Sequence, residues 1–209
     1  MKMNNRKEFS PKEIAIFQAV LELFRDGADI NSFTVADITR QAGIGKGTAY
    51  EYFSDKDEMI AKAIFYHAEQ FCLSLFEQML DEKTVYDRIM LVLKRIETEI
   101  AEANCIFRLI QVSCNKSGLG QKMQEIEGLK SVYGLKPDEI LGRIIGSDFG
   151  VSVSISEYKQ EYLMLAVISK LCCYGIYLQK NADLEVAKRE TMREMICVGI
   201  CREIEEALI

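Results

Sequence analysis

Residues Thr34–Lys56 read TVADITRQAGIGKGTAYEYFSDK, and this stretch decides how the chain is interpreted. Thr34 with Asp37 three positions later is typical of a helix N-terminus, because each side chain can bond the backbone amide of the other residue. Gly43 suits a tight turn, since glycine adopts backbone angles that other residues avoid. A second short helix follows over residues 46–53. The order of helix, glycine turn and helix predicts a helix-turn-helix.

Two further helices are predicted on either side of this stretch. Ser10 and Glu13 form a cap signature before a first helix, whose apolar residues follow at spacings of three and four. Asp55 and Glu58 repeat the signature at the start of a fourth helix that continues to about Leu80. Three cap signatures this close together favour a helical N-terminal domain.

The remainder of the chain has the pattern of longer helices. Helices are expected at about 84–103, 104–115, 157–179 and 183–208. The segment 116–156 is rich in glycine and is expected to hold loops and one short helix over 137–145.

The composition favours an all-helical protein of one to two domains. Among 209 residues, 49% are hydrophobic and 28% charged, with two prolines and no tryptophan. No apolar run approaches the roughly 18 residues of a membrane span, and the polar N-terminus differs from a secretory signal. We therefore expect a cytoplasmic protein with reduced cysteines and no cofactor.

The charge balance limits how the chain can bind nucleic acid. Its net charge is −6, and residues 1–57 hold eight basic and nine acidic side chains, a net of −1. Bulk attraction to DNA is therefore excluded. Any affinity for DNA must come from a few well-placed cations and backbone amides, doubled by dimerisation.

The start of the second short helix, GKGT at residues 45–48, has the chemistry for DNA contact. Its glycines let the backbone approach a duplex, and the helix N-terminus offers amides to a phosphate. Lys46 suits a phosphate or guanine, and Thr48 a base edge or a thymine methyl. Tyr50 offers an aromatic edge to bases or sugars, and Tyr52 offers a hydroxyl to a phosphate. The alternative is that this turn and its tyrosines belong to an ordinary helical core.

The same residues carry a resemblance to a known family. The turn Ala42–Ile44, the run Gly47–Phe53 and the segment Asp55–Met59 resemble the N-terminal domain of the TetR (tetracycline-repressor-like) bacterial transcription regulators. The resemblance covers roughly the first 65 residues. It implies phosphate contacts from Thr34, Tyr52 and Lys56, and groove contacts from Lys46, Gly47, Thr48 and Tyr50.

The resemblance also implies an architecture. A helix-turn-helix domain at 1–56 is expected to continue, through a shared fourth helix, into a helical ligand-binding and dimerisation domain at 57–209. Glycine inside a long helix costs about 1 kcal/mol, so close approach by a partner or plain packing must explain Gly175 and Gly199. The expected dimer interface comprises Gly175, Met192, Ile196 and Gly199. The candidates for an effector cavity, each with ordinary core packing as the alternative, are Phe71, Met90, Phe107, Gln111 and Tyr174.

The expected function is that of a ligand-responsive transcription regulator. It would bind a palindromic operator as a homodimer, repress transcription, and be released by a small molecule. The alternative is a structural or partner-recruiting DNA-binding protein that needs no effector. An enzyme is not expected, because the chain has no nucleophile motif and one histidine, His67. Either packing or thiol and metal sensing can explain the cysteine pairs Cys105 and Cys114, Cys172 and Cys173, and Cys197 and Cys201.

Overall fold

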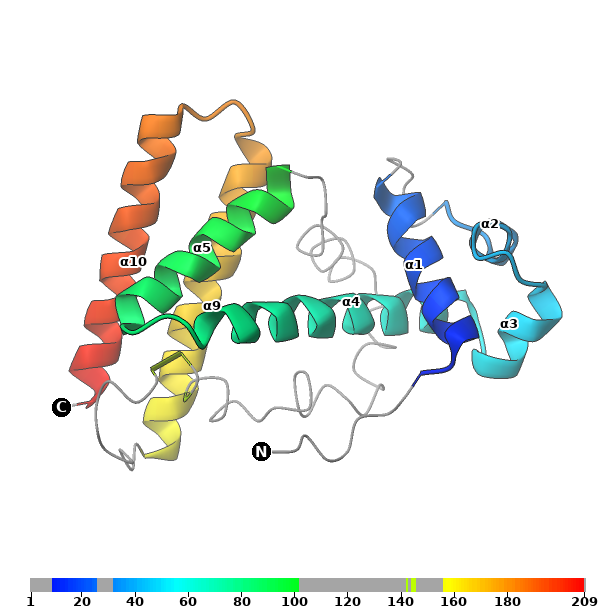
Figure 1. Ribbon diagram of the computed structural model, residues 1–209, viewed down its shortest axis with the longest axis horizontal. Helices are drawn as coiled ribbons and strands as arrows, with labels where there is room; N and C mark the ends of the chain where they lie inside the picture. Colours follow the sequence, from blue (N-terminus) through cyan, green and yellow to red (C-terminus); the bar gives the residue numbers. More distant parts are fainter. Residues whose placement is uncertain (1–8, 26–31, 102–141, 143, 146–155, 209) are drawn as a thin grey trace. The chain divides into compact units, whose positions relative to one another are not determined.

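The computed structural model describes residues 9–25, 32–101, 142, 144–145 and 156–208, and every regular element in them is a helix. The expected all-α fold is confirmed. The expected helix at 104–115 lies outside the described residues, and of the one at 137–145 only three helical residues are described. The elements are α1 (Pro11–Arg25), α2 (Val35–Gln41), α3 (Lys46–Tyr52), α4 (Lys56–Met79), α5 (Val85–Ala101), α9 (Glu157–Lys180) and α10 (Val186–Leu208) (Figure 1).

The chain divides into two compact units inside α4, between Phe71 and Cys72. The N-terminal unit holds α1, α2, α3 and the first part of α4. The C-terminal unit holds the end of α4 with α5, α9 and α10. The sequence interpretation placed the domain boundary between residues 56 and 57, at the start of the same helix. One continuous helix therefore contributes to both units, as expected.

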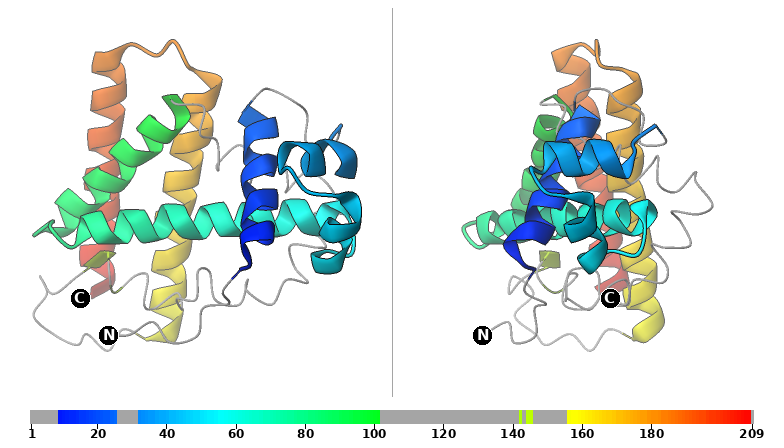
Figure 2. Two further views of the ribbon diagram at one scale, coloured as in Figure 1. Left: turned by 45° about the vertical axis from the view of Figure 1, so that its right-hand side comes forward. Right: turned by 90° about the vertical axis from the view of Figure 1, so that its right-hand side faces the viewer.

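The N-terminal unit is built around an aromatic core. α1 packs against both α2 and α3, as both views of Figure 2 show. Its Phe17 is fully buried and contacts Phe53, which follows α3, with ring centroids 5.9 Å apart. Phe9 and Tyr66 approach the same ring at 5.0 and 5.1 Å. Phe53 is therefore a core residue, and burying an aromatic ring of this size contributes about 1.5–3 kcal/mol.

His67 of α4 serves this packing. Its Nε2 lies 2.8 Å from the carbonyl oxygen of Phe17 in α1. Burial lowers the pKa of His67, and this outweighs the opposite effect of the hydrogen bond to Phe17. The neutral ring therefore donates a structural hydrogen bond between two helices.

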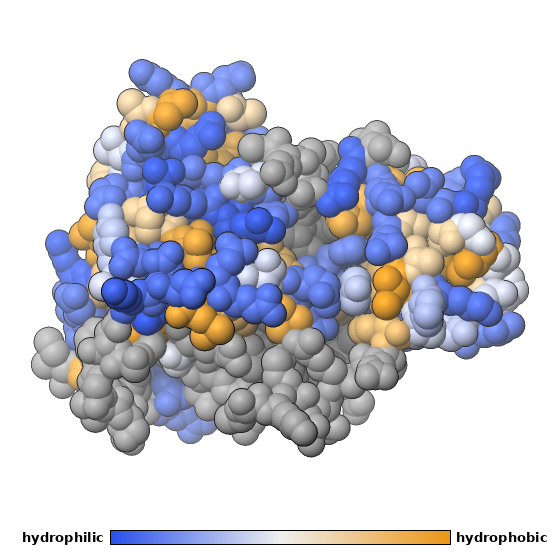
Figure 3. Space-filling view, in the orientation of Figure 1, coloured by the Kyte–Doolittle hydropathy of each residue, from blue (hydrophilic) through white to orange (hydrophobic). Residues whose placement is uncertain are grey.

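The C-terminal unit rests on α5, α9 and α10, each of which contacts the other two (Figure 1). Its core is apolar and includes the fully buried Leu93 of α5, Leu163 of α9 and Ile200 of α10. Lys159 donates from Nζ to the carbonyl oxygen of Ala207 at 3.0 Å, which ties the start of α9 to the end of α10. On the face drawn in Figure 3, hydrophilic side chains cover much of the described surface, with separate apolar areas between them.

Candidate nucleic-acid interface

α2 begins with a complete capping box. The backbone amide of Asp37 donates to Thr34 Oγ1 at 3.2 Å, and the backbone amide of Thr34 donates to Asp37 Oδ2 at 3.0 Å. The Thr34 hydroxyl also donates to Asp37 Oδ2 at 2.6 Å. These bonds from Thr34 lower the pKa of Asp37. Both donors of Thr34 are thus engaged by Asp37, so a phosphate contact from its hydroxyl requires that the hydroxyl rotate away.

The turn between α2 and α3 depends on one glycine. Gly43 has a φ of +67°, in the left-handed region that glycine occupies without strain. The backbone amide of Ile44 then reaches back to the carbonyl oxygen of Thr39 at 3.0 Å. α3 starts two residues later with Gly45 as its cap, and no side chain caps its amides. The turn and the short second helix thus form as the sequence predicted.

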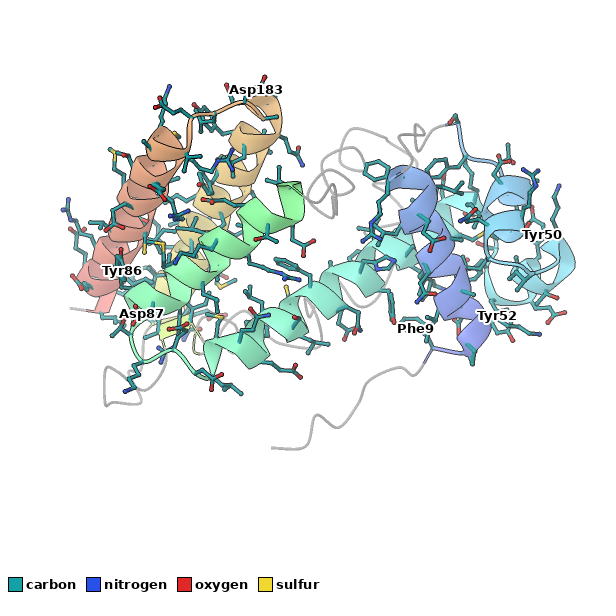
Figure 4. All side chains as sticks on the ribbon, turned by 45° about the horizontal axis from the view of Figure 1, so that its top comes forward. Phe9, Tyr50, Tyr52, Tyr86, Asp87 and Asp183 are labelled. Atoms are coloured by element: carbon teal, nitrogen blue, oxygen red, sulfur yellow. The ribbon has the colours of Figure 1, made fainter. Side chains whose placement is uncertain are left out.

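α3 presents two different faces. Ala49 is fully buried in the N-terminal unit. Lys46 and Gly47 are exposed at the helix start, and Tyr50 has 52% of its surface exposed. Tyr52 is half-buried, and Figure 4 shows that its side chain leaves the helix in a different direction from that of Tyr50. Thr48 is also half-buried. Of the residues expected to reach the groove, Lys46, Gly47 and Tyr50 are therefore exposed, whereas Thr48 is partly covered.

Lys56, the first residue of α4, lies at the other end of this surface. Its Nζ donates to the carbonyl oxygen of Phe33 at 2.8 Å, directly before Thr34. The structure therefore brings Thr34 and Lys56, two of the expected phosphate contacts, to one corner of the unit. This bond fixes the position of the Lys56 ammonium group beside Thr34.

The start of α4 is also fixed by Glu58. Its Oε2 accepts from the backbone amide of Ser54 at 2.6 Å, and its Oε1 pairs with Lys62 Nζ at 2.6 Å. Burial alone would raise the pKa of Glu58, but the hydrogen bonds from Lys62 and Ser54 outweigh it and hold the pKa at about 2. The helix that carries Lys56 is therefore anchored by an ionised carboxylate.

Two charged residues on this surface were missed by the sequence interpretation. Glu51 is exposed on α3, two positions after the buried Ala49, and so faces outward on the helix. Arg40 at the end of α2 has a side chain 76% exposed and pairs with Asp37 at 3.4 Å. The helical period alone would have identified Glu51, since a residue two positions from the buried one lies about 200° around the helix.

The effector candidates are distributed unevenly over the structure. Phe71 falls in the N-terminal unit, whereas Met90 and Tyr174 both belong to the C-terminal unit. Met90 is half-buried, and Tyr174 is buried with its hydroxyl donating to Glu97 Oε1. Burial and this hydrogen bond raise the pKa of Tyr174 above its usual range. The other two candidates, Phe107 and Gln111, lie outside the described residues.

The candidate interface residues differ in their surroundings. Gly175 is buried within its own chain, while Met192 and Ile196 are half-buried. Gly199 is half-buried, and a Cβ added there would meet no atom within 4 Å. Packing inside the described chain therefore does not explain why Gly199 has no side chain.

The cysteines of the described residues are free thiols in different environments. Cys197 is buried and donates to the carbonyl oxygen of Tyr86 at 3.5 Å, whereas Cys173 is exposed. The hydrogen bond from Cys197 lowers the pKa of Cys201. No group of three or more potential ligands that could hold a metal occurs among the residues described. Cys105 and Cys114 lie outside them. Packing in the core can thus explain Cys197, which is buried, but not Cys173, which is exposed.

Comparison with known proteins identifies the DNA-reading unit. Residues 16–63 match the family model described as "Bacterial regulatory proteins, tetR family". Residues 16–63 are therefore a DNA-binding domain of the TetR family. The match contains α2, the glycine turn, α3 and the start of α4. A chain with this domain is a DNA-binding transcription regulator and not an enzyme.

Full-length relatives agree with this assignment. The chain is 26% identical over 194 residues to the fatty acid metabolism regulator protein of Bacillus subtilis, covering 93% of this chain and 98% of the relative. It is 24% identical over 191 residues to an HTH-type transcriptional regulator of Staphylococcus aureus, covering 88% of this chain and 98% of the relative. The fold resembles the crystal structure of FadR from Bacillus subtilis in complex with stearoyl-CoA. The TM-score is 0.65 and the sequence identity 21%, and the match covers 89% of this chain and 98% of that structure.

Proposed function

We propose that the chain is a homodimeric repressor that binds a palindromic operator and is released by a long-chain fatty acyl effector. The observation that carries the proposal is the helix-turn-helix with exposed Lys46, Gly47 and Tyr50, in a chain whose full-length relative is a regulator of fatty acid metabolism. Because such a protein acts on DNA, we expect it in the cytoplasm.

DNA docking follows from the two ends of the N-terminal surface. α3 enters a major groove, where Lys46 reaches a phosphate or a guanine, Tyr50 reaches base edges and the glycine at 47 allows close approach. Tyr52 and the corner formed by Thr34 and Lys56 meet phosphates. Glu51 adds an acceptor on the outward side of α3, which matches the amino group of cytosine in the major groove. The readout therefore uses both a cation and a carboxylate, in keeping with a unit that is not basic.

Dimerisation is supported by an apolar surface on α9 and α10. Leu165 of α9 is 72% exposed, and Met195 of α10 is 69% exposed. We call this the outer face; its other exposed apolar residues are Tyr158, Tyr162, Ile168 and Val198. Gly199 lies on α10 next to Val198, and its missing side chain leaves space for a second helix. Large exposed apolar side chains gathered on two helices favour an interaction site, and a second copy of the chain can cover them symmetrically.

A membrane is the other environment that could cover α9. By length and composition this helix could cross one, contrary to the sequence interpretation, which looked for an uninterrupted apolar run. Core helices of soluble proteins have the same length and composition. Leu163 and Val167 on its inner side are buried against the chain's own core, so only the outer face needs a partner.

A binding experiment tests the proposed function directly. The purified chain is titrated onto a fluorescent palindrome from its own upstream region, followed by anisotropy, and stearoyl-CoA is then added. We expect binding as a dimer and release by stearoyl-CoA but not by free coenzyme A. If stearoyl-CoA leaves the DNA bound and genome-wide profiles show many scattered sites, the effector-independent alternative replaces the proposal.

The dimer is tested by light scattering at micromolar concentration. Leu165→Glu places a charge in the outer face and is expected to give monomers. Leu80→Glu is the matched control, because Leu80 is 80% exposed at the end of α4 and lies outside the outer face. A wild-type monomer, or a dimer that survives Leu165→Glu, would contradict the assigned interface.

A further inference from the structure

The C-terminal unit contains a buried polar cluster, which we define as Glu97 of α5, Tyr174 of α9, and Arg189 and Arg193 of α10. Glu97 accepts from the Tyr174 hydroxyl through Oε1 and from Arg193 Nη1 through Oε2 at 2.9 Å. The Glu97 and Arg193 side chains are only 13% and 16% exposed. Arg189 donates from Nη2 to the carbonyl oxygen of Leu184 at 3.4 Å. Three helices thus meet at one carboxylate.

The two arginines of the cluster share one face of α10. They are four residues apart, so their side chains lie one above the other. Both arginines act to lower the pKa of Tyr174, against the rise caused by burial and Glu97. With one carboxylate and two guanidinium groups, the cluster holds an excess of one positive charge.

The donors of the cluster are not all used. In the described part of the chain, the Nε atoms of Arg189 and Arg193 are buried and have no hydrogen-bond partner. A buried donor without an acceptor costs free energy, and native proteins keep few of them. An apolar residue at 189 would remove this cost without breaking the pair of Glu97 with Arg193. The bond to Leu184 uses one donor of Arg189 and leaves its buried Nε without an acceptor.

We infer that Arg189 and Arg193 form a subsite for the anionic group of an amphiphilic effector. A carboxylate or phosphate oxygen accepts from the two free Nε–H donors, for which the planar guanidinium is well suited. One added negative charge neutralises the cluster. The apolar chain of the effector then occupies the surrounding interior, in the usual pattern of an apolar pocket with few polar groups. This inference rests on the proposed function, because it concerns the same effector.

The most informative variant is Arg189→Gln. It removes one guanidinium and leaves the bonds of Glu97 to Tyr174 and Arg193 in place. The matched control is Lys94→Gln, which removes an exposed positive charge from α5. The probes are palmitate, palmitoyl-CoA and the neutral 1-hexadecanol, which share one chain length. Dissociation constants are measured by calorimetry below the micelle concentrations.

We expect the wild type and Lys94→Gln to bind at least one anionic probe about tenfold or more tightly than hexadecanol. Arg189→Gln is expected to weaken that binding about 10- to 100-fold, the range of one charge-assisted hydrogen bond, and to leave hexadecanol unaffected. If Arg189→Gln loses affinity for palmitate only, the subsite binds a carboxylate. If it loses affinity for palmitoyl-CoA only, the subsite binds a phosphate.

Other results would overturn the inference. If Arg189→Gln binds both anionic probes as tightly as the wild type does, the subsite is excluded and the proposed function stays intact. The same holds if the wild type binds hexadecanol as tightly as the anionic probes. If the wild type binds none of the three probes, both proposals fail. Should circular dichroism show that Arg189→Gln is unfolded, the double variant Glu97→Gln with Arg193→Gln replaces it, because it removes one charge of each sign and keeps hydrogen-bonding groups.

Discussion

Replacing Arg88 with methionine is expected to destabilise the C-terminal unit by about 3–6 kcal/mol. The Arg88 side chain is buried on α5 and donates to four backbone carbonyls. Nη1 bonds Ile145 at 3.0 Å and Ile144 at 3.4 Å, and Nη2 bonds Glu82 at 3.0 Å and Lys83 at 3.3 Å. One guanidinium therefore joins the turn before α5 to residues 144–145.

The magnitude follows from the two short bonds. A hydrogen bond from a charged donor contributes about 1.5–3 kcal/mol to stability, and each of the two bonds near 3.0 Å is expected to contribute that full amount. The longer two add little. Methionine keeps most of the apolar stem but leaves these carbonyls without their donor. For a protein of this size, about 2–4 °C of melting temperature is lost per kcal/mol, which predicts a decrease of about 10 °C.

Urea and thermal unfolding followed by circular dichroism provide the measurement. Lys94→Met is the control, because it removes an exposed positive charge from the same helix and should change stability by less than about 0.5 kcal/mol. If Arg88→Met unfolds within 1 kcal/mol of this control, roughly the error of such a comparison, the carbonyl bonds do not stabilise the unit as argued.

Three further predictions concern the N-terminal unit. Lys46→Ala is expected to lower the slope of log affinity against log salt by about one, and an unchanged slope would exclude a phosphate contact. Glu51→Gln should reduce discrimination for cytosine at one operator position by about 1–3 kcal/mol; base preferences identical to wild type in a selection from random DNA would reject that readout. The pKa of Glu58 falls from 4.5 to about 2 on folding, so its stabilisation is complete above pH 4.5 and lost as the pH falls towards 2. Acid titrations of wild type and Glu58→Gln should diverge in that range, and parallel curves would contradict the assignment.

Much of the N-terminal unit was predictable because its signals are local. Thr34 with Asp37, Gly43 at the turn, and Asp55 with Glu58 act through neighbours three or four residues away, and each feature appears where the sequence placed it. Exposure also follows from the helical period, which should have singled out Glu51 on α3.

The C-terminal unit was predictable only as helices. α5, α9 and α10 begin and end close to the expected positions, but no spacing reveals that Glu97 meets both Tyr174 and Arg193. Those partners are separated by 77 and 96 residues. Tyr174 was expected to line an effector cavity, and the structure shows that its hydroxyl donates to Glu97.

The sequence by itself determined where the helices lie and which segment reads DNA, because capping, turn formation and amphipathic spacing act over a few residues. The tertiary structure decided which side chains meet. Lys56 reaches the carbonyl of Phe33 and Arg88 reaches Ile145 only because distant helices pack together. The same holds for Arg189 and Arg193 of α10, because their Nε donors lack a partner only once the packed helices exclude water from them.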